Sequence, residues 1–376
     1  MIAKITIIYY NVPMDYFFTQ VLTDIVQRSQ VCVDRPLRCI IIVNPAAGAF
    51  NMKSRWAGRV QTLSDCRNKA GANPTRAIYK NIILNLTEGK GSASEITKAL
   101  IERAIKDPVP FYLVISAGGD GTHGEVMLAL YNAPAEVRSN MAVLRLPMGT
   151  GNDGADSSSM EKALDLLLKP VHIEYMPAVQ LTTAKGGPSS WKGPFVAFNI
   201  LSIGLDAYVV HKTNEMKAKK PGDSYQFWVD VAALFYDKKF KVDYMSVKAF
   251  DKNNKEVSSF REKLLLLAMG VSGNRTYGSQ QHILPDHRNV CGIKQMSLFK
   301  KLAIKGQVTK GNHIYNPNAI FLNAKRVEFS GYQPILAQMD GETILLQPED
   351  FPAVMELTAP VIPQLKLGEE EILTIA

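Results

Sequence analysis

The chain has 376 residues, of which 46% are hydrophobic and 21% are charged, and its net charge is +8. This composition supplies a sizeable core and excludes an intrinsically disordered chain, and the length suggests two domains. No apolar run approaches about 18 residues, which excludes a membrane-spanning helix. Four scattered cysteines lack metal-ligand spacing and indicate reduced thiols in a cytoplasmic protein. The positive charge suits an anionic substrate or an anionic membrane surface, or it serves only solubility.

The first 36 residues contain one amphipathic stretch. Its apolar residues recur at helical spacing, and they are Phe17, Phe18, Val21, Leu22, Ile25 and Val26. Arg28 is the only base on the polar face, whereas a helix that lies on anionic lipid usually carries more. We therefore favour a helix packed on the rest of the chain, or on a partner chain, over a membrane-docking helix. A homodimer stays open.

Residues 37–170 repeat a strand–turn–helix pattern. Apolar runs without alternation predict strands buried on both faces at 39–43, 82–86, 111–115 and 141–146. Segments with helical periodicity separate them. Strands joined by helices of this length predict a parallel sheet with right-handed crossovers.

Glycine-containing turns follow three of these strands. They read Asn44, Pro45, Ala46, Ala47, Gly48; then Gly118, Gly119, Asp120, Gly121, Thr122; and then Gly149, Thr150, Gly151, Asn152, Asp153. A glycine loop between a strand and a helix is the layout of a phosphate site. Asp120 and Glu125 stand where a simple phosphate cradle carries a lysine, so they suggest a magnesium contact, a proton acceptor or a ribose contact. Taken alone, a tight turn capped by Asp120 explains the central loop equally well.

The third turn also satisfies the Gly-x-Gly-x-x-Gly pattern of dinucleotide-binding folds, from Gly149 to Gly154. Glu174 falls roughly where a ribose-binding acid is expected. We disfavour this alternative because that pattern usually opens the fold, and here it follows earlier strand–loop units. The P-loop pattern is absent from the sequence, which argues against a P-loop kinase mechanism.

From about residue 171 the sequence changes character. Short apolar segments separated by glycine, proline and asparagine predict an antiparallel β domain. One apolar helical stretch, at 225–236, has lysines on both sides. Such a helix suits contact with a bilayer, but a core helix with solvated lysines at its ends explains it equally well.

The three turns together resemble the diacylglycerol kinase-like lipid kinases, a family that includes the sphingosine kinases and is more distantly similar to the NAD kinases. The matching motifs are Asn44-Pro45-x-x-Gly48, Gly118-Gly119-Asp120-Gly121-Thr122-x-x-Glu125-Val126 and Leu146-Pro147-x-Gly149-Thr150-x-Asn152-Asp153. The third motif argues against an NAD kinase, which stays the enzyme alternative.

The resemblance implies two domains after an N-terminal extension at 1–36. The first, at 37–172, is an α/β nucleotide-binding domain with a parallel sheet. The second, at 173–349, is a mainly antiparallel β domain that takes the lipid. The tail, 350–376, is expected to return to the first domain. The active site is expected between the two domains.

The resemblance also implies the reaction: transfer of the γ-phosphate of ATP, with Mg²⁺, to the hydroxyl of a diacylglycerol- or sphingoid-like lipid. The protein would visit a membrane surface transiently from the cytoplasm, and we expect no nucleic-acid partner. Nucleotide contacts are expected from the three turns, with Ala46 and Ala47 included, and from Thr87 and Glu125. Asp120 is also the expected metal ligand.

Three further acids match family motifs and join Asp120 as candidate catalytic residues. They are Asp206 in Gly204-Leu205-Asp206, and Asp340 and Glu342 in Asp340-Gly341-Glu342. Taken alone, the second motif fits a hairpin turn. We favour Glu342 as the general base, because it lies on the domain expected to hold the lipid, with Asp120 serving metal and phosphate geometry and Asp340 in support.

One departure from the family lies near the end of a Gly-Asn segment that starts at Gly273. Cys291 falls where the family has a metal-linked aspartate. A thiol is a poor magnesium ligand, so we expect no structural magnesium there. This departure motivates a third alternative, a non-catalytic relic, against which the intact Asp120, Glu125, Asp340 and Glu342 argue. The sequence leaves the lipid acceptor open.

Overall fold

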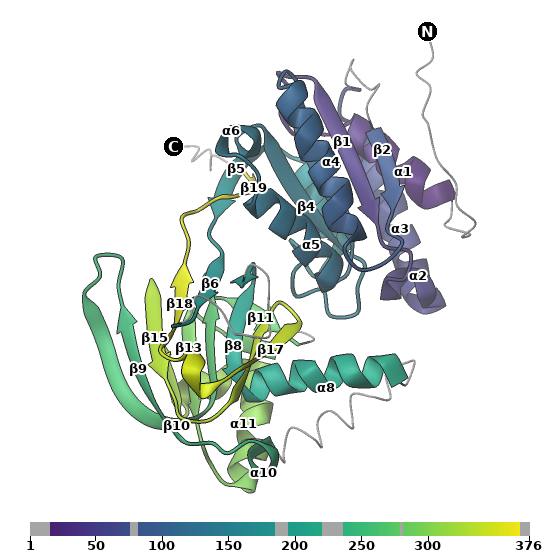
Figure 1. The fold of residues 1–376 in the computed structure, drawn as a ribbon. Helices are drawn as coiled ribbons and strands as arrows, with labels where there is room; N and C mark the ends of the chain where they lie inside the picture. The colour runs from purple at the N-terminus through teal and green to yellow at the C-terminus, as the bar shows by residue number, and fades with distance from the viewer. Residues whose placement is uncertain (1–15, 76–81, 185–194, 220–235, 279–280, 369–376) are drawn as a thin grey trace, which may run out of the picture. The chain divides into compact units, whose positions relative to one another are not determined.

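The computed structural model describes residues 16–75, 82–184, 195–219, 236–278 and 281–368. The chain divides into two compact units (Figure 1). Unit 1 comprises Met1–Met176 and Pro360–Ala376, and unit 2 comprises Pro177–Ala359. Unit 1 is an α/β unit with a mainly parallel sheet, and unit 2 is built on antiparallel strands, so the predicted fold class is confirmed.

Unit 1 is organised around a six-stranded sheet with the order β2–β1–β3–β4–β19–β5. Every residue of β3 and β4 is buried, as expected for strands covered on both faces. The strand β19 pairs parallel with β4 and antiparallel with β5, so residues from after unit 2 complete this sheet. The strand bounds are β1 Leu37–Val43, β2 Ile82–Leu86, β3 Phe111–Gly118, β4 Met141–Pro147, β5 Val171–Met176 and β19 Ile362–Leu367.

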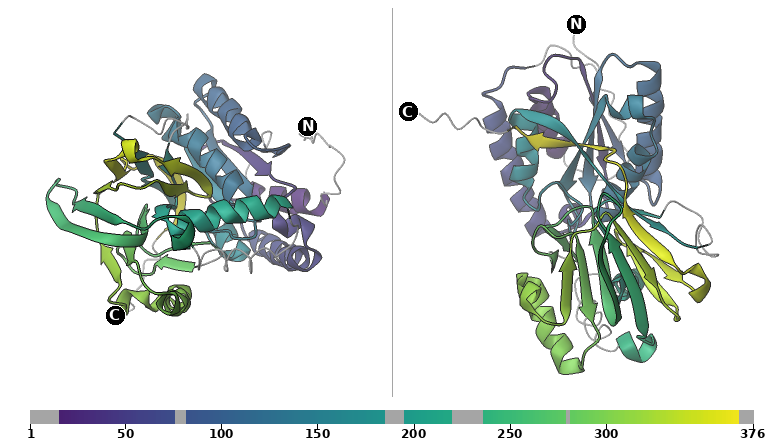
Figure 2. Two further views of the ribbon diagram at one scale, coloured as in Figure 1. Left: turned by 60° about the horizontal axis from the view of Figure 1, so that its bottom comes forward. Right: turned by 90° about the vertical axis from the view of Figure 1, so that its left-hand side faces the viewer.

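Helices cover both faces of this sheet (Figure 2). On one face, side chains of α1, α3 and α7 share a hydrophobic core with alternate residues of β1 and β3, such as Ile41 and Leu113. On the other face, α4 packs against α5. The helix bounds are α1 Tyr16–Gln27, α2 Gly48–Asn51, α3 Lys53–Ala70, α4 Ser92–Lys106, α5 Asp120–Tyr131, α6 Ala135–Arg138 and α7 Met160–Leu168.

Helix α1 buries the apolar stripe that the sequence pattern indicated. Val21, Leu22 and Ile25 are fully buried in the core of unit 1. The Phe18 ring is also buried and meets the Phe50 ring edge to face, with 5.3 Å between the ring centroids. The prediction that this helix packs on the rest of the chain is confirmed, and the membrane-docking interpretation of it is wrong.

Unit 2 is organised around an eleven-stranded sheet. Its main order is β17–β16–β8–β10–β9–β15–β18–β6–β7, and β13 and β14 branch from β10. Every residue in the second half of β10 is buried: β8 and β13 pair with its two edges, and side chains of three helices share the core with residues such as Leu265. The strand bounds are β6 Val179–Thr182, β7 Val196–Ala197, β8 Ile200–Gly204, β9 Tyr244–Phe250, β10 Glu256–Gly270, β13 Val290–Lys294, β14 Ala319–Leu322, β15 Arg326–Ser330, β16 Ile335–Met339, β17 Glu342–Leu346 and β18 Ala353–Leu357.

A two-stranded hairpin, β11 Arg275–Tyr277 with β12 Gln281–Leu284, lies outside the main sheet. The helices of unit 2 include α8 Leu205–Lys219, α10 Tyr236–Lys239 and α11 Leu298–Lys310. Of the apolar helix expected at 225–236, only Tyr236 lies within the described residues, where it begins α10. Within the described ranges, no helix is both long enough and apolar enough to cross a bilayer.

Candidate nucleotide loops and acceptor-side residues

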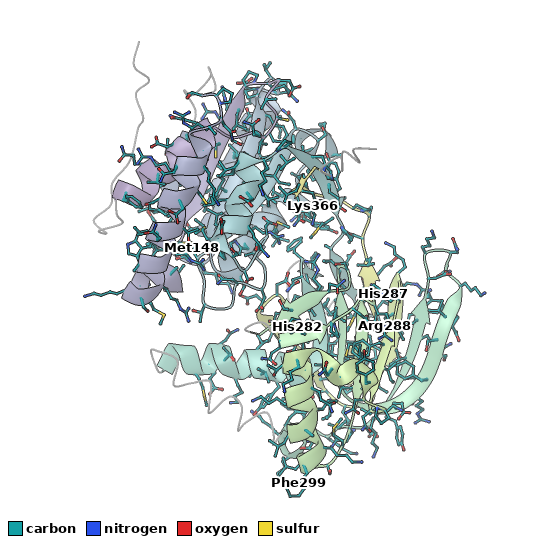
Figure 3. All side chains as sticks on the ribbon, turned by 180° about the vertical axis from the view of Figure 1, so that it is seen from behind. Met148, His282, His287, Arg288, Phe299 and Lys366 are labelled. Carbon is teal, nitrogen blue, oxygen red and sulfur yellow. The ribbon has the colours of Figure 1, made fainter. Side chains whose placement is uncertain are left out.

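The three glycine-containing turns meet at one edge of the unit 1 sheet. Because β1, β3 and β4 are parallel neighbours, the loops after their carboxyl ends lie side by side. The Asn44 side chain donates a hydrogen bond to Thr122 Oγ1 at 3.0 Å, which joins the first loop to the second. The amide of Ala49 donates to the carbonyl of Met148 at 2.9 Å, and the Met148 amide donates to the carbonyl of Gly118 at 3.0 Å. Figure 3 marks Met148 in the third loop.

Glycines in these loops permit very close backbone approach. A Cβ on Gly149 would lie 2.5 Å from the Gly119 Cα, and a Cβ on Gly118 would lie 2.6 Å from the Thr122 side chain. Neither contact is sterically possible, so both positions require glycine. None of these glycines has a positive φ angle. Glycine permits both a positive φ and a close backbone approach, and at these positions only the close approach applies.

Gly121 differs from its neighbours. It lies in the first turn of α5, and a Cβ there would meet no atom of the described residues within 4 Å. Protein packing therefore does not explain this glycine. The amino-terminal end of α5 carries unpaired amide groups and a partial positive charge, which favour an anion.

Two carboxylates flank that helix end. Asp120 is the first residue of α5, and its Oδ1 accepts a hydrogen bond from the Gly154 amide at 2.7 Å. The other oxygen of Asp120 and the Oδ2 of Asp153 lie 3.0 and 3.2 Å from one point, the position of a Cβ on Gly151. Two hard oxygen donors beside a helix amino terminus fit Mg²⁺, which usually takes one or two carboxylates plus phosphates and water. Among the described residues, no three or more His, Cys, Asp or Glu side chains gather to hold a metal ion by themselves.

Glu125 holds a loop rather than facing the glycine turns. Its Oε1 accepts the Gly91 amide at 2.7 Å and its Oε2 accepts the Ala93 amide at 3.0 Å. The carboxylate thus satisfies amides at the start of α4. Thr87 lies in the same loop, where its amide donates to the carbonyl of Val43 at 2.9 Å. Glu125 therefore ties the Thr87 loop to α5, beside the end of β1.

His123, which follows Thr122 in the second turn, belongs to the core. Its Nδ1 lies 2.8 Å from Ser116 Oγ, and both side chains are buried. Burial, together with the nearby Arg145 cation, lowers the pKa of His123 to about 3, so the imidazole is neutral at neutral pH. The Arg145 charge is balanced by Asp156 in a buried ion pair at 2.7 Å.

Sequence reasoning missed Arg55. A guanidinium nitrogen of Arg55 lies 3.6 Å from the position of a Cβ on Gly48, and Thr150 Oγ1 lies 2.8 Å from the same point. Arg55 therefore places a cation where the first and third loops meet. Arg59, one turn later, has its pKa lowered by burial and then by the Arg55 charge. The sequence signal for it is a pair of arginines, Arg55 and Arg59, four residues apart in the helix that follows a glycine turn.

Asp340 anchors the Asp-Gly-Glu turn of unit 2. Its carboxylate accepts the backbone amides of Phe198, Asn199 and Ile200, the last two at 3.1 Å. The turn between β16 and β17 has positive φ at Asp340, 47°, and at Gly341, 106°. Glycine is favoured at the second position because side chains rarely adopt that conformation.

Asp206 belongs to the same part of unit 2. It lies in the first turn of α8, and its Oδ2 accepts hydrogen bonds from Ser202 Oγ at 2.6 Å and from the buried Gln338 at 3.3 Å. The Asn214 side chain of α8 donates to the carbonyl of Gly341 at 2.8 Å. Asp206, Asp340 and Glu342 are thus linked through α8 and the turn, and the Glu342 side chain is exposed at the start of β17.

The surroundings of Cys291 do not fit a magnesium ion. Cys291 lies in β13 with its side chain fully buried in the unit 2 core, and burial raises the pKa of its thiol. A buried, protonated thiol does not offer the hard anionic oxygen that magnesium prefers. Asp286 is engaged by Arg288, which holds the pKa of Asp286 below its usual value.

Comparisons with known proteins agree on one family. Residues 38–179 match the model of the Diacylglycerol kinase catalytic domain. A diacylglycerol kinase of Bacillus subtilis is 22% identical over 331 residues, which cover 84% of this chain and 92% of that protein. A protein of an Enterobacter species, named probable lipid kinase YegS-like, is 24% identical over 266 residues, covering 70% of this chain and 80% of that protein.

A solved structure shares the fold. The structure of a diacylglycerol kinase from Bacillus anthracis superposes with a TM-score of 0.52 at 15% identity, covering 87% of this chain and 96% of that one. The chain therefore resembles lipid kinases along most of its length, and its residues 38–179 match the model of the diacylglycerol kinase catalytic domain.

Proposed function

We propose that this protein is an ATP-dependent lipid kinase that transfers the γ-phosphate of ATP to a hydroxyl group of a diacylglycerol- or sphingoid-like lipid. The observation that carries the proposal is the meeting of three glycine turns at the amino-terminal end of α5, with two carboxylates beside it. This arrangement supplies amides and a helix dipole for phosphates, and hard oxygens for a metal ion.

The nucleotide residues divide into two groups by what they do. Gly121 and the adjoining amides of α5 take phosphate oxygens, while Asp120 and Asp153 would hold a magnesium ion, which when bound would supply charge neutralisation for the phosphates. Arg55 adds a cation at the first loop. Glu125 positions the Thr87 loop through backbone amides and acts indirectly.

The acceptor residues lie in unit 2. The lipid hydroxyl oxygen attacks the γ-phosphorus, the bond from phosphorus to the bridging oxygen breaks, and ADP leaves. The hydroxyl proton passes to the Glu342 carboxylate, a contribution that typically amounts to about 10²–10⁴-fold in rate. Asp340 and Asp206 act as positioning residues, because their carboxylates are hydrogen-bonded to backbone amides and to buried side chains.

An acceptor screen with radiolabelled ATP tests the proposal. The panel contains diacylglycerol, sphingosine, other hydroxylated lipids and NAD, each with and without Mg²⁺. We expect label in at least one lipid and none in NAD. Labelled NAD with no labelled lipid would make the protein an NAD kinase, and nucleotide binding without turnover of any acceptor would make it a non-catalytic relic.

A further inference from the structure

The buried side chain of Gln338 connects Asp206 with the Asp-Gly-Glu turn. Gln338 lies in β16 and is fully buried, directly opposite Ser202 of β8 in the sheet. Its amide nitrogen faces three oxygen atoms, which are Ser202 Oγ at 2.9 Å and the Ile200 carbonyl and Asp206 Oδ2, both at 3.3 Å. Its amide oxygen accepts the backbone amide of Gly341 at 3.3 Å. Because a glutamine amide has one donor end and one acceptor end, the three oxygens fix which end faces the turn.

Helix α8 binds the residues before and after Glu342 in the chain. The helix packs against β16 and β17 (Figure 1). Its Asn214 side chain donates to the Gly341 carbonyl at 2.8 Å. His211, three residues earlier and on the same face of the helix, has its Nδ1 3.4 Å from Thr343 Oγ1. Side chains therefore bind both backbone polar groups of Gly341, its amide and its carbonyl.

These two bonds matter because Gly341 has no side chain of its own. Its φ is 106°, and a Cβ there would meet no atom of the described residues within 4 Å. Glycine also has the widest choice of backbone conformations. The conformation of Gly341 sets where the next Cα, that of Glu342, lies. A catalytic group must be held within about 0.5 Å of its productive position, so the side chains that bind Gly341 also act on Glu342.

We propose that Gln338 and Asn214 are positioning residues for Glu342, and that Asp206 acts through Gln338. The two side chains fix the peptide groups on both sides of the Gly341 Cα, and with them the start of β17, where Glu342 accepts the hydroxyl proton. Asp206 holds the donor end of the Gln338 amide and contributes without touching the substrate. The inference rests on the proposed function, in which Glu342 is the general base.

Kinetics of the full chain test the positioning roles, with ATP, Mg²⁺ and either a short-chain, water-soluble diacylglycerol or sphingosine. We expect Asn214→Ala and Gln338→Met each to lower kcat about 10-fold, because a displaced base loses part of its contribution. The KM for ATP should stay near parental in both. Thr213→Ala, at the neighbouring position of α8, is the matched control and should retain the parental kcat.

The same substitutions in a Glu342→Gln background separate positioning from a general loss of structure. If Asn214 and Gln338 act through Glu342, adding either substitution should lower kcat no further, because residues that act as a unit are not additive. A further loss of about 10-fold in that background would contradict the inference, since it would show an effect that does not pass through Glu342.

An exchange of donor and acceptor tests the part of Asp206. Gln338→Glu alone places a second carboxylate against that of Asp206 and should lower kcat. The double variant Asp206→Asn with Gln338→Glu restores a donor–acceptor pair and should recover part of that loss. A double variant no more active than Gln338→Glu would show that Asp206 is needed for its own charge and not for Gln338.

Hydrogen exchange at the Gly341 amide tests the anchoring without any turnover. We expect this amide to exchange at least about 10-fold faster in Gln338→Met, because its acceptor is lost, and at the parental rate in Thr213→Ala. Parental exchange in Gln338→Met would overturn the inference. A parent that phosphorylates neither lipid would instead count against the proposed kinase function, and the exchange rates would still decide whether Gln338 holds the turn.

Discussion

The nucleotide loops of unit 1 and the Asp-Gly-Glu turn of unit 2 use the same residue types in different ways. In unit 1, Gly149 is required because its Cα meets that of Gly119, and no loop glycine has a positive φ. In unit 2, Gly341 is favoured because φ there is 106°, and a Cβ would meet no described atom within 4 Å. The glycines of unit 1 thus let three loops approach one another closely, whereas Gly341 lets a single segment turn between β16 and β17.

The aspartates of the two regions differ in the same manner. Asp120 lies at a helix amino terminus, where its Oδ1 accepts the Gly154 amide, and its Oδ2 and that of Asp153 lie 3.0 and 3.2 Å from the position of a Cβ on Gly151. The Asp340 carboxylate accepts three backbone amides and holds the turn that presents Glu342. An aspartate beside a glycine in a sequence motif therefore has no fixed set of partners, and only the folded structure identifies them.

The largest expected effect belongs to Glu342. We expect Glu342→Gln to lower kcat by about 10²–10⁴-fold, because the amide cannot accept the hydroxyl proton. ATP and Mg²⁺ affinity, measured by calorimetry, should stay near parental. Glu349→Gln, an exposed acid of the same unit, is the control. Near-parental kcat in Glu342→Gln, with turnover abolished only in Asp120→Asn at normal metal affinity, would exchange the two roles.

The variant Asp340→Ala tests the structural role of Asp340, because it removes the carboxylate that accepts backbone amides at the Asp-Gly-Glu turn. Three amides near β8 would lose their acceptor, which we expect to lower the free energy of unfolding by roughly 3 kcal/mol. Urea unfolding measures this loss. kcat should fall with it, since Glu342 is no longer held in place, while ATP affinity is retained. A stable Asp340→Ala protein with abolished ATP binding would show that Asp340 contacts the nucleotide instead.

The buried His123 makes the stability of unit 1 depend on pH. Its folded-state pKa is about 3, below the unfolded value of about 6.5, so the unfolded state binds the proton first as pH falls. Stability is therefore lost as pH falls from about 6.5 toward 3, by roughly 2 kcal/mol at pH 5. In unfolding experiments at pH 7 and pH 5, His123→Asn should lose less stability than the parent. Equal losses in both proteins would show that His123 is not the titrating group.

Arg55 tests whether the first loop contributes charge to the nucleotide site. Arg55→Ala should raise the Kd for ATP about 10-fold, the size expected for one charge-assisted hydrogen bond. Arg67→Ala on the same helix, where Arg67 pairs with Asp24 at 3.0 Å, is the control. Identical ATP affinity in Arg55→Ala and the parent would place the phosphates away from the first loop.

Much of the fold was predictable, because the central strands of unit 1 are mainly apolar runs without alternation and the strands of unit 2 are short segments between turn residues. The elements that cover α1 could not be predicted, because helical periodicity identifies an apolar stripe but does not identify the segments that pack on it. The return of residues 362–367 to unit 1 likewise has no local signal in the sequence. It was expected only from the family resemblance.

The candidate site was predictable in its residues but not in their roles. The motifs identified Glu125 and Asp340 as acids of interest. Their partners lie 34 and about 140 residues away in the chain, so only the folded structure shows that both bind backbone amides. Arg55 was not predicted, because it belongs to no motif. It lies near Gly48 only because the chain turns at Met52.

The central claim, that ATP phosphates lie at the amino-terminal end of α5, is tested most directly with two glycines of that helix. Neither Gly121 nor Gly124 has a described atom within 4 Å of its Cβ position, so valine at either position should leave the fold intact and cost similar helix propensity. Gly119 is unsuitable for this test, because a Cβ there would lie 3.3 Å from the Gly149 Cα and valine would disturb the loops. In calorimetry with Mg²⁺ and ATP, we predict parental affinity for Gly124→Val and at least about a 10-fold loss for Gly121→Val, at matching melting temperatures. Parental ATP affinity in Gly121→Val would contradict the assignment.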